Sequence, residues 1–217
     1  MAYRQTEHTQ AKKADTRARI LKEARQLVTE GGFAAAAIAP VAKRSGIATG
    51  TIYRHFPSKA ELVAEVFRQA TQHELEAVTA ATLGHEDPAT RLRRGIKTFA
   101  SRALQSPRLA YALIAEPVDP LVEKERLSYR FAYAQAFEDL ILDGMSCGAF
   151  AAQSPSVTSA ALVGMLAESL VGPLAPKAQS FDEQLTEREQ FSVEQKQTLL
   201  DEITALCLRA VGVKKQP

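Results

Sequence analysis

Residues 38–56 read IAPVAKRSGIATGTIYRHF, and this stretch decides the fold. It predicts two short helices, over 38–45 and 49–55. A tight turn joins them at Gly46, because a residue without a side chain can take the left-handed backbone conformation there. Two short helices joined in this way are typical of a helix-turn-helix, which reads DNA. Three apolar residues at helical spacing are expected to lock the helices together: Val41, Ile47 and Ile52.

The outward residues of this pair have side chains that suit contact with DNA. Threonine hydroxyls bind phosphates or base edges, arginine reads guanine or clamps a phosphate, and glycine lets the backbone approach the duplex. A lysine at the start of the next helix offers a further cation to a phosphate. We therefore expect DNA contacts from Thr49, Gly50, Thr51, Arg54, His55 and Lys59, and the predicted set also includes Arg44.

The longer run from Gly32 to Leu62, GFAAAAIAPVAKRSGIATGTIYRHFPSKAEL, resembles the signature of the TetR family of bacterial regulators. The resemblance covers roughly residues 15–65. It implies a homodimer with a DNA-binding head and an effector-binding C-terminal domain, and it places Tyr53 and Lys59 where members of the family contact phosphates. The matching positions are Gly32-Phe33, Ala42, Gly46, Gly50-Thr51-Ile52-Tyr53, Phe56-Pro57-Ser58-Lys59 and Leu62.

Two positions depart from the family pattern at the starts of the helices. The family usually has Ser or Thr before the first helix of the motif and Ser before the second, where this chain has Ala36-Ala37 and Ala48. A lost N-cap costs roughly 0.5–2 kcal/mol. Thr49 offers an alternative cap, which would move the start of the second helix by one residue.

Charge is distributed unevenly along the chain. Residues 1–60 carry 11 Lys/Arg and four Asp/Glu, a net +7, whereas residues 61–217 carry 16 and 21, a net −5. A basic head on an acidic body favours nucleic-acid binding at the head. A solvated basic helix face is the alternative that charge alone leaves open.

The rest of the chain predicts an all-α protein. A first helix begins near Asp15 and ends at Gly31-Gly32, and no segment has the alternation of a strand. Proline and glycine divide the remainder into helices, so that about nine are expected in all. After the helix-turn-helix these helices span 59–82, 88–105, 107–115, 119–144, 155–172 and 192–211.

The predicted domain organisation has three parts. Residues 1–13 form a flexible polar arm, 14–58 the helix-turn-helix domain, and 59–213 a domain for effector binding and dimerisation. Residues 176–191 are polar and are expected to form a loop or a loose helical insert.

The C-terminal helices have more apolar surface than one buried face requires. Helix 119–144 is expected to be buried on two sides, with Leu127 and Phe131 on one of them, so that the other can line a cavity. Glu168 lies in a nearly all-apolar helix and is either a polar anchor for a ligand or an exposed or intersubunit-paired carboxylate. The predicted ligand-binding residues are Phe99, Arg102, Tyr111, Glu116, Tyr133, Phe137 and Glu168.

The last two large helices also predict a dimer interface. Helix 155–172 is apolar all round, and helix 192–211 has an apolar stripe, so that two helices from each subunit would form a four-helix interface. The resembled family dimerises in this way, and an intramolecular core is the alternative. The predicted interface residues are Ala160, Gly164, Ala167, Leu199, Ile203 and Leu206.

Other classes of function have little support. The four histidines share no metal-ligand spacing, and no catalytic or cofactor motif is present, so that we expect neither metal, cofactor nor enzymatic activity. The apolar stretch 157–175 is too interrupted to predict a membrane span. We expect a cytoplasmic repressor that binds a near-palindromic operator as a homodimer and responds to a small molecule. The alternatives are a helical enzyme or carrier with an incidental basic head, and an effector-free DNA-binding dimer.

Overall fold

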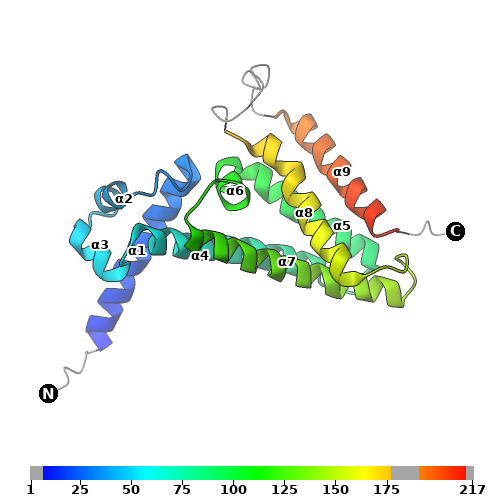
Figure 1. The fold of residues 1–217 in the computed structure, drawn as a ribbon, viewed down its shortest axis with the longest axis horizontal. Helices are drawn as coiled ribbons and strands as arrows, with labels where there is room; N and C mark the ends of the chain where they lie inside the picture. The colour runs from blue at the N-terminus through cyan, green and yellow to red at the C-terminus, as the bar shows by residue number, and fades with distance from the viewer. Residues whose placement is uncertain (1–6, 177–190, 214–217) are drawn as a thin grey trace.

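The computed structural model describes residues 7–176 and 191–213, and within these ranges the chain contains helices and no strand (Figure 1). The all-α prediction is confirmed. The helices of the described ranges are α1 (Glu7–Gly31), α2 (Ile38–Ser45), α3 (Thr49–His55), α4 (Lys59–Thr82), α5 (Pro88–Gln105), α6 (Pro107–Ile114), α7 (Pro120–Ser146), α8 (Pro155–Leu174) and α9 (Val193–Ala210).

The first helix is longer than the sequence predicts. It begins at Glu7 rather than near Asp15. The additional segment, HTQAKKA, has no apolar face, but Ala, Gln and Lys have high intrinsic helix propensity and extend a helix once it is nucleated. Residues 1–6 of the predicted arm and 177–190 of the predicted loop lie outside the described residues.

Two apolar cores divide the molecule into a head and a body. The head, at the left of Figure 1, contains α1, α2, α3 and the first half of α4. The body contains α5, α7, α8, α9 and the end of α4. Because α4 has Leu62 and Phe67 in the head core and Val78 in the body core, it belongs to both. The division between domains at residue 58 therefore stays a prediction.

Part of the C-terminal chain completes the core of the head. Leu109 and Ala112 of α6 and Val122 of α7 are buried in the head core, at 7%, 0% and 0% exposure. Helix α6 packs directly against α1. Close packing of this kind between α6 and the head core does not deform continuously, so the orientation of the head depends on the position of α6.

Polar contacts reinforce this packing. Arg108 and Glu116 make them with the turn after α1, and we call this set of contacts the junction. Arg108 Nη2 donates to the carbonyl oxygen of Gly31 at 2.7 Å. The backbone N–H of Ala34 donates to Glu116 Oε1 at 3.4 Å, and Arg108 pairs with Glu116 at 3.5 Å. Glu116 is buried in this position, where its charge is balanced by its partners.

The other end of α6 is held by a buried arginine of α7. The Arg126 guanidinium donates to three backbone carbonyls at the C-terminus of α6 and pairs with Glu123 at 2.5 Å. Burial lowers the pKa of Arg126. Its hydrogen bonds to these carbonyls and its ion pair with Glu123 are the partners that a buried cation requires. The carbonyls belong to Ala112, Leu113 and Glu116.

Helix α7 is buried on one side only, and the prediction of burial on two sides is wrong. Tyr133 and Phe137 lie in the body core, whereas Leu127 and Phe131 are 52% and 68% exposed. Helices α4, α5 and α8 all pack against α7. No helix in the described part of the chain covers the side of α7 on which Leu127 and Phe131 lie.

Helix α8 also has one buried and one open face. Its leucines lie in the body core, while Ala160, Ala161 and Gly164 are exposed. By length and hydropathy α8 could cross a membrane, against the sequence expectation, and 33% of its apolar window is buried within the chain. Because the leucine face packs against α7 and α9, we interpret α8 as a bundle helix with an uncovered outer face.

Candidate functional site

Helices α2 and α3 form the tight pair that the sequence predicts. Gly46 has φ 66°, the left-handed conformation that ends α2. The N–H of Ile47 donates to the carbonyl of Ala42 at 3.1 Å across the turn. Val41 and Ile52 are fully buried, so the inward faces of both helices are fixed against the head core.

Two arginines of α1 brace this pair and are occupied by the fold. Arg19 Nη2 donates to the carbonyl of Ser45 at 2.8 Å, at the end of α2. The Arg17 guanidinium lies 4.9 Å from the centroid of the Phe56 ring and pairs with Glu65 at 3.3 Å. Their charges contribute to the positive charge of the head, but their side chains already make contacts within the protein.

The missing N-caps are a property of the folded chain. Ala37 and Ala48 occupy the N-cap positions of α2 and α3, and neither supplies a side-chain hydrogen bond. Ser58, by contrast, caps α4 and accepts from the N–H of Glu61 at 3.1 Å. Because α3 begins at Thr49 with Ala48 as its cap, the alternative register with Thr49 as the cap is not adopted.

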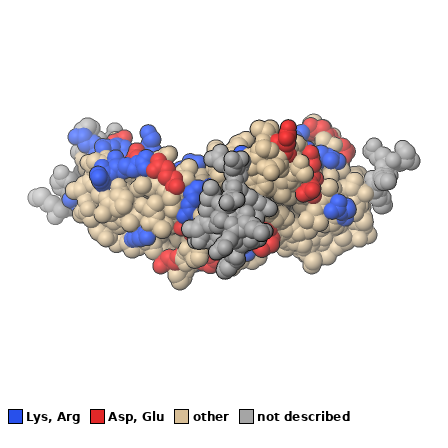
Figure 2. Space-filling model, turned by 90° about the horizontal axis from the view of Figure 1, so that it is seen from above, with Lys and Arg blue, Asp and Glu red and all other residues tan. Residues whose placement is uncertain are grey.

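The outer side of α3 presents the predicted contact residues to solvent. Thr49, Gly50, Arg54 and Lys59 are exposed, Tyr53 is 48% exposed, and Thr51 and His55 are half-buried. Arg54 has no ion pair with any described residue, so its guanidinium is available for an anionic partner. Figure 2 shows Lys and Arg side chains gathered at the head end of the face drawn.

Arg44 differs from the other predicted DNA-binding residues. It makes two hydrogen bonds to Glu30, at 2.5 and 3.0 Å, and pairs with Glu23 at 3.2 Å. Arg44 lowers the pKa of Glu30 to about 2. Two carboxylates of α1 therefore already balance this guanidinium, which makes Arg44 a weaker candidate for DNA contact than Arg54.

The surroundings of the His55 imidazole lower its pKa and so disfavour the imidazolium form. Burial is the largest cause of the lowered pKa of His55, and the neighbouring cations Lys13, Arg17 and Arg54 lower it further. These are the cations that phosphates would neutralise if DNA bound here. The protonation of His55 therefore reports on contact between this surface and DNA.

We expect NMR titration to give His55 a pKa below the ordinary 6.5 in the free protein, and a higher pKa when operator DNA is added. Phosphates favour the charged imidazolium, so DNA binding takes up a proton and strengthens as pH falls through this range. A His55→Gln variant should lose that part of the pH dependence. A pKa that does not change on adding DNA would place His55 away from the interface.

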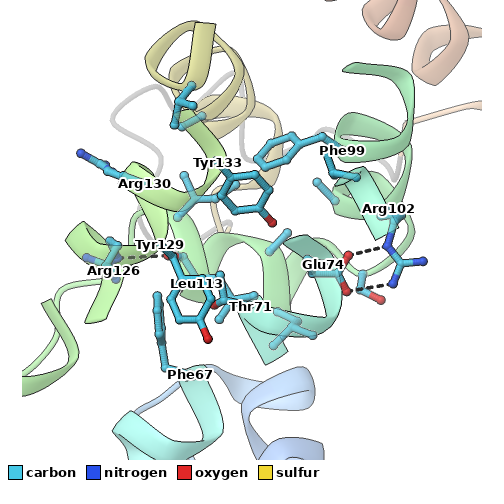
Figure 3. A pocket seen from close by; sticks show the side chains of 18 residues that line it. Phe67, Thr71, Glu74, Phe99, Arg102, Leu113, Arg126, Tyr129, Arg130 and Tyr133 are labelled. Carbon is cyan, nitrogen blue, oxygen red and sulfur yellow. Dashed lines mark hydrogen bonds and ion pairs between the residues drawn. The ribbon is translucent and has the colours of Figure 1, made fainter. Parts of the chain in front are cut away.

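A cavity lies in the body, walled by α4, α5, α6, α7 and α8 (Figure 3). Its volume is about 90 Å³, and most of its lining is apolar. The apolar residues lining it include Phe67, Val78, Phe99, Ala103, Leu109, Ala110, Leu113, Ile114, Val163 and Ala167.

Four polar residues of the cavity lining come from α4, α5 and α7. Glu74 of α4 binds Arg102 of α5 through two hydrogen bonds, of 2.5 and 3.0 Å. Tyr133 of α7 is 7% exposed, and its ring meets that of Phe99 edge-on at 5.5 Å. Thr71 of α4 is 6% exposed, and its Oγ1 has no hydrogen-bond partner in the described part of the chain. Burial raises the pKa of Tyr133, so its hydroxyl stays protonated.

Three of the predicted ligand-binding residues line this cavity: Phe99, Arg102 and Tyr133. The other four lie elsewhere: Tyr111 and Phe137 in the body core, Glu116 in the junction, and Glu168 exposed on α8. Sequence reasoning missed the polar lining residues Thr71, Glu74, Ser106, Arg126, Tyr129 and Arg130. Helical spacing places Thr71 and Glu74 on one face of α4, but it does not say which helices face that side.

The predicted dimer residues fall into two groups. Ala160, Gly164 and Leu206 are exposed, and a Cβ built on Gly164 would meet no atom within 4 Å. Leu199 is half-buried, Ile203 is buried in the body core, and Ala167 lines the cavity. The exposed group leaves Ala160 and Gly164 uncovered on α8 and Leu206 uncovered on α9, whereas Ile203 packs within one chain.

The N-terminal region of the chain is similar to known bacterial regulators. Residues 20–66 match the family of bacterial regulatory proteins of the tetR type. The transcriptional regulator UidR of Escherichia coli K12 is 35% identical over 69 residues, which are 32% of this chain and 35% of UidR. This match thus spans about a third of the length of that relative.

Two further proteins extend the likeness beyond the head. The transcriptional repressor KstR2 of Rhodococcus jostii RHA1 is 26% identical over 136 residues, covering 63% of this chain and 66% of KstR2. The regulator FadR of Bacillus subtilis, solved in complex with stearoyl-CoA, superposes with a TM-score of 0.70 at 15% identity, covering 89% of this chain and 98% of FadR. At that identity the superposition establishes a shared fold.

Proposed function

We propose that the chain is a ligand-responsive transcriptional repressor of the tetR family of bacterial regulatory proteins, whose family model its residues 20–66 match. The family consists of regulators rather than enzymes. The observation that carries the proposal is the exposed face of α3, whose Arg54 forms no ion pair with a described residue, on a head whose core includes α6. Such a protein would act in the bacterial cytoplasm.

We propose that α3 enters the major groove of double-stranded DNA. Arg54 has the chemistry to read guanine, and the threonine methyl and hydroxyl groups of Thr49 and Thr51 suit thymine methyls and base edges. Tyr53 and Lys59 flank this face and suit phosphate contacts, which fix orientation without carrying sequence information. Gly50 presents no side chain, so the backbone can approach the duplex.

An Arg54→Ala variant should bind DNA more weakly by about 1–3 kcal/mol if the guanidinium reads a base, because one good base contact is worth that much. If the guanidinium contacts a phosphate instead, the salt slope should fall by about one. The measurement is a salt-titrated gel shift on the duplex that flanks the protein's coding region.

The matched control is Arg93→Ala, which removes the same charge from an exposed site on α5 in the body. It should leave both affinity and salt slope nearly unchanged. If Arg54→Ala matched wild type in both quantities, α3 would not be the reading helix. If the wild-type protein bound the flanking duplex no more tightly than unrelated DNA, that duplex would contain no operator for it.

We propose that α8 and α9 form the interface of a homodimer, which would bind a near-palindromic operator. The support is the uncovered small-residue face of α8 at Ala160, Ala161 and Gly164, which would let a second helix approach closely. Two copies related by a two-fold axis would bury the same face against itself and space two α3 helices for successive grooves.

An Ala160→Glu variant should be a folded monomer. The position is exposed in one chain, so the new carboxylate costs little there, but a two-fold axis would bury two of them in one interface. Sedimentation equilibrium of wild type and variant measures the change. Ala80→Glu, an exposed position on α4, is the control and should stay dimeric. A dimeric Ala160→Glu would place the interface elsewhere.

We propose that a ligand in the cavity controls the head through α6. Leu113 and Ile114 of α6 line the cavity, while Leu109 both lines the cavity and lies in the head core. A ligand that prefers one position of α6 would therefore also prefer one orientation of the head, and would shift DNA affinity accordingly. The cavity favours this proposal over a DNA-binding dimer without an effector.

A further inference from the structure

The size of the cavity limits what it can hold. One buried water needs about 10–15 Å³ of cavity volume, counted as the space open to the centre of a water molecule. A cavity of about 90 Å³ on this measure has room for roughly six to nine waters. At about 30 Å³ for each liquid water, that space matches a molecule of roughly ten non-hydrogen atoms. A long acyl chain is far larger than this, so the measured space favours a compact ligand.

Two hydroxyl groups of the lining have unmet hydrogen-bonding capacity. Thr71 Oγ1 is buried and has no hydrogen-bond partner in the described part of the chain. The Tyr133 side chain is 7% exposed, and its Oη makes no hydrogen bond to a described residue but keeps some accessible surface. Figure 3 shows the Tyr133 hydroxyl directed into the space beside Glu74. An unsatisfied buried hydroxyl such as Thr71 Oγ1 is unfavourable, and a hydrogen bond to a ligand oxygen would relieve that cost.

The charges of the lining are already balanced. Arg102 is bound by both carboxylate oxygens of Glu74, and Arg126 by Glu123 together with three backbone carbonyls. Arg130 is exposed at the edge of the cavity rather than inside it. A buried net charge on a ligand would find no free buried counter-ion, and leaving it unpaired is costly.

We propose that the cavity binds a compact, uncharged ring compound that has a hydroxyl or carbonyl oxygen. The oxygen hydrogen-bonds to the hydroxyl groups of Thr71 and Tyr133, and the ring packs against Phe99 and the apolar side chains of α6. This inference rests on the proposed function in one respect, that the cavity is the effector site. Ligand binding is measured without DNA, so its test does not depend on DNA binding.

The test uses 2-naphthol as the probe. Two compounds of similar size are compared with it: naphthalene, which has no oxygen, and 2-naphthoate, which has a negative charge. The chain contains no tryptophan, so naphthol fluorescence reports binding directly. Wild type should bind 2-naphthol more tightly than naphthalene, 2-naphthoate or stearoyl-CoA. Thr71→Val and Tyr133→Phe should each weaken 2-naphthol roughly 3- to 10-fold and leave naphthalene unchanged.

Two controls separate loss of the hydroxyl from loss of the fold. Thr71→Val removes an unpartnered hydroxyl, so the Tm of the ligand-free variant should be equal to or higher than that of wild type. Thr79→Val makes the same change on α4 outside the cavity lining and should bind 2-naphthol as wild type does.

Three results would overturn the inference: no binding of 2-naphthol, tighter binding of 2-naphthoate, or equal binding by wild type and both hydroxyl variants. None of these results would disturb specific DNA binding by the ligand-free protein, which the gel shift measures separately. Loss of that DNA binding would instead defeat the proposed function while leaving the ligand measurements intact.

Discussion

The structure depends on the packing of α6 between the two halves of the molecule. Leu109 and Ala112 complete the core of the DNA-binding head, while Leu113 and Ile114 line the cavity of the body. Arg126 holds the C-terminal carbonyls of α6, and Arg108 and Glu116 bind the turn that follows α1. Helix α6 is therefore fixed from both sides, and neither the head nor the cavity can be changed without affecting its position.

This arrangement explains why one chain can join two separate chemistries. The head exposes hydroxyls, a guanidinium and an amine that suit binding of a polyanion. The body has a cavity with a mostly apolar surface and two hydroxyls that have no hydrogen-bond partner among the described residues. The sites are linked only if the ligand has different affinities for two positions of α6, and the coupling is then reciprocal. The junction suits such a role, because the hydrogen bonds of Arg108 Nη2 and Glu116 Oε1 depend on where α6 lies relative to the turn after α1.

Local signals in the sequence predicted the helices well. Pro88, Pro107 and Pro155 mark the starts of α5, α6 and α8, and Gly46 marks the turn before α3. The cavity could be predicted only in part, because it depends on which helix faces lie together. Arg102 and Glu74 are 28 residues apart and Arg126 binds carbonyls 10 to 14 residues away, so helical spacing within one element could not reveal either contact. The exposure of Leu127 and Phe131 was mispredicted for the same reason, since an apolar stripe shows that a face prefers burial but not that a partner covers it.

The central claim is that the cavity controls DNA binding through the junction. The direct measurement is the operator affinity of wild type and of Arg108→Met, each with and without saturating cavity ligand. The account predicts that ligand weakens wild-type binding about 5- to 150-fold, the usual range of allosteric coupling, and weakens Arg108→Met much less. Equal weakening in both proteins, or no weakening of wild type at saturation, would contradict it.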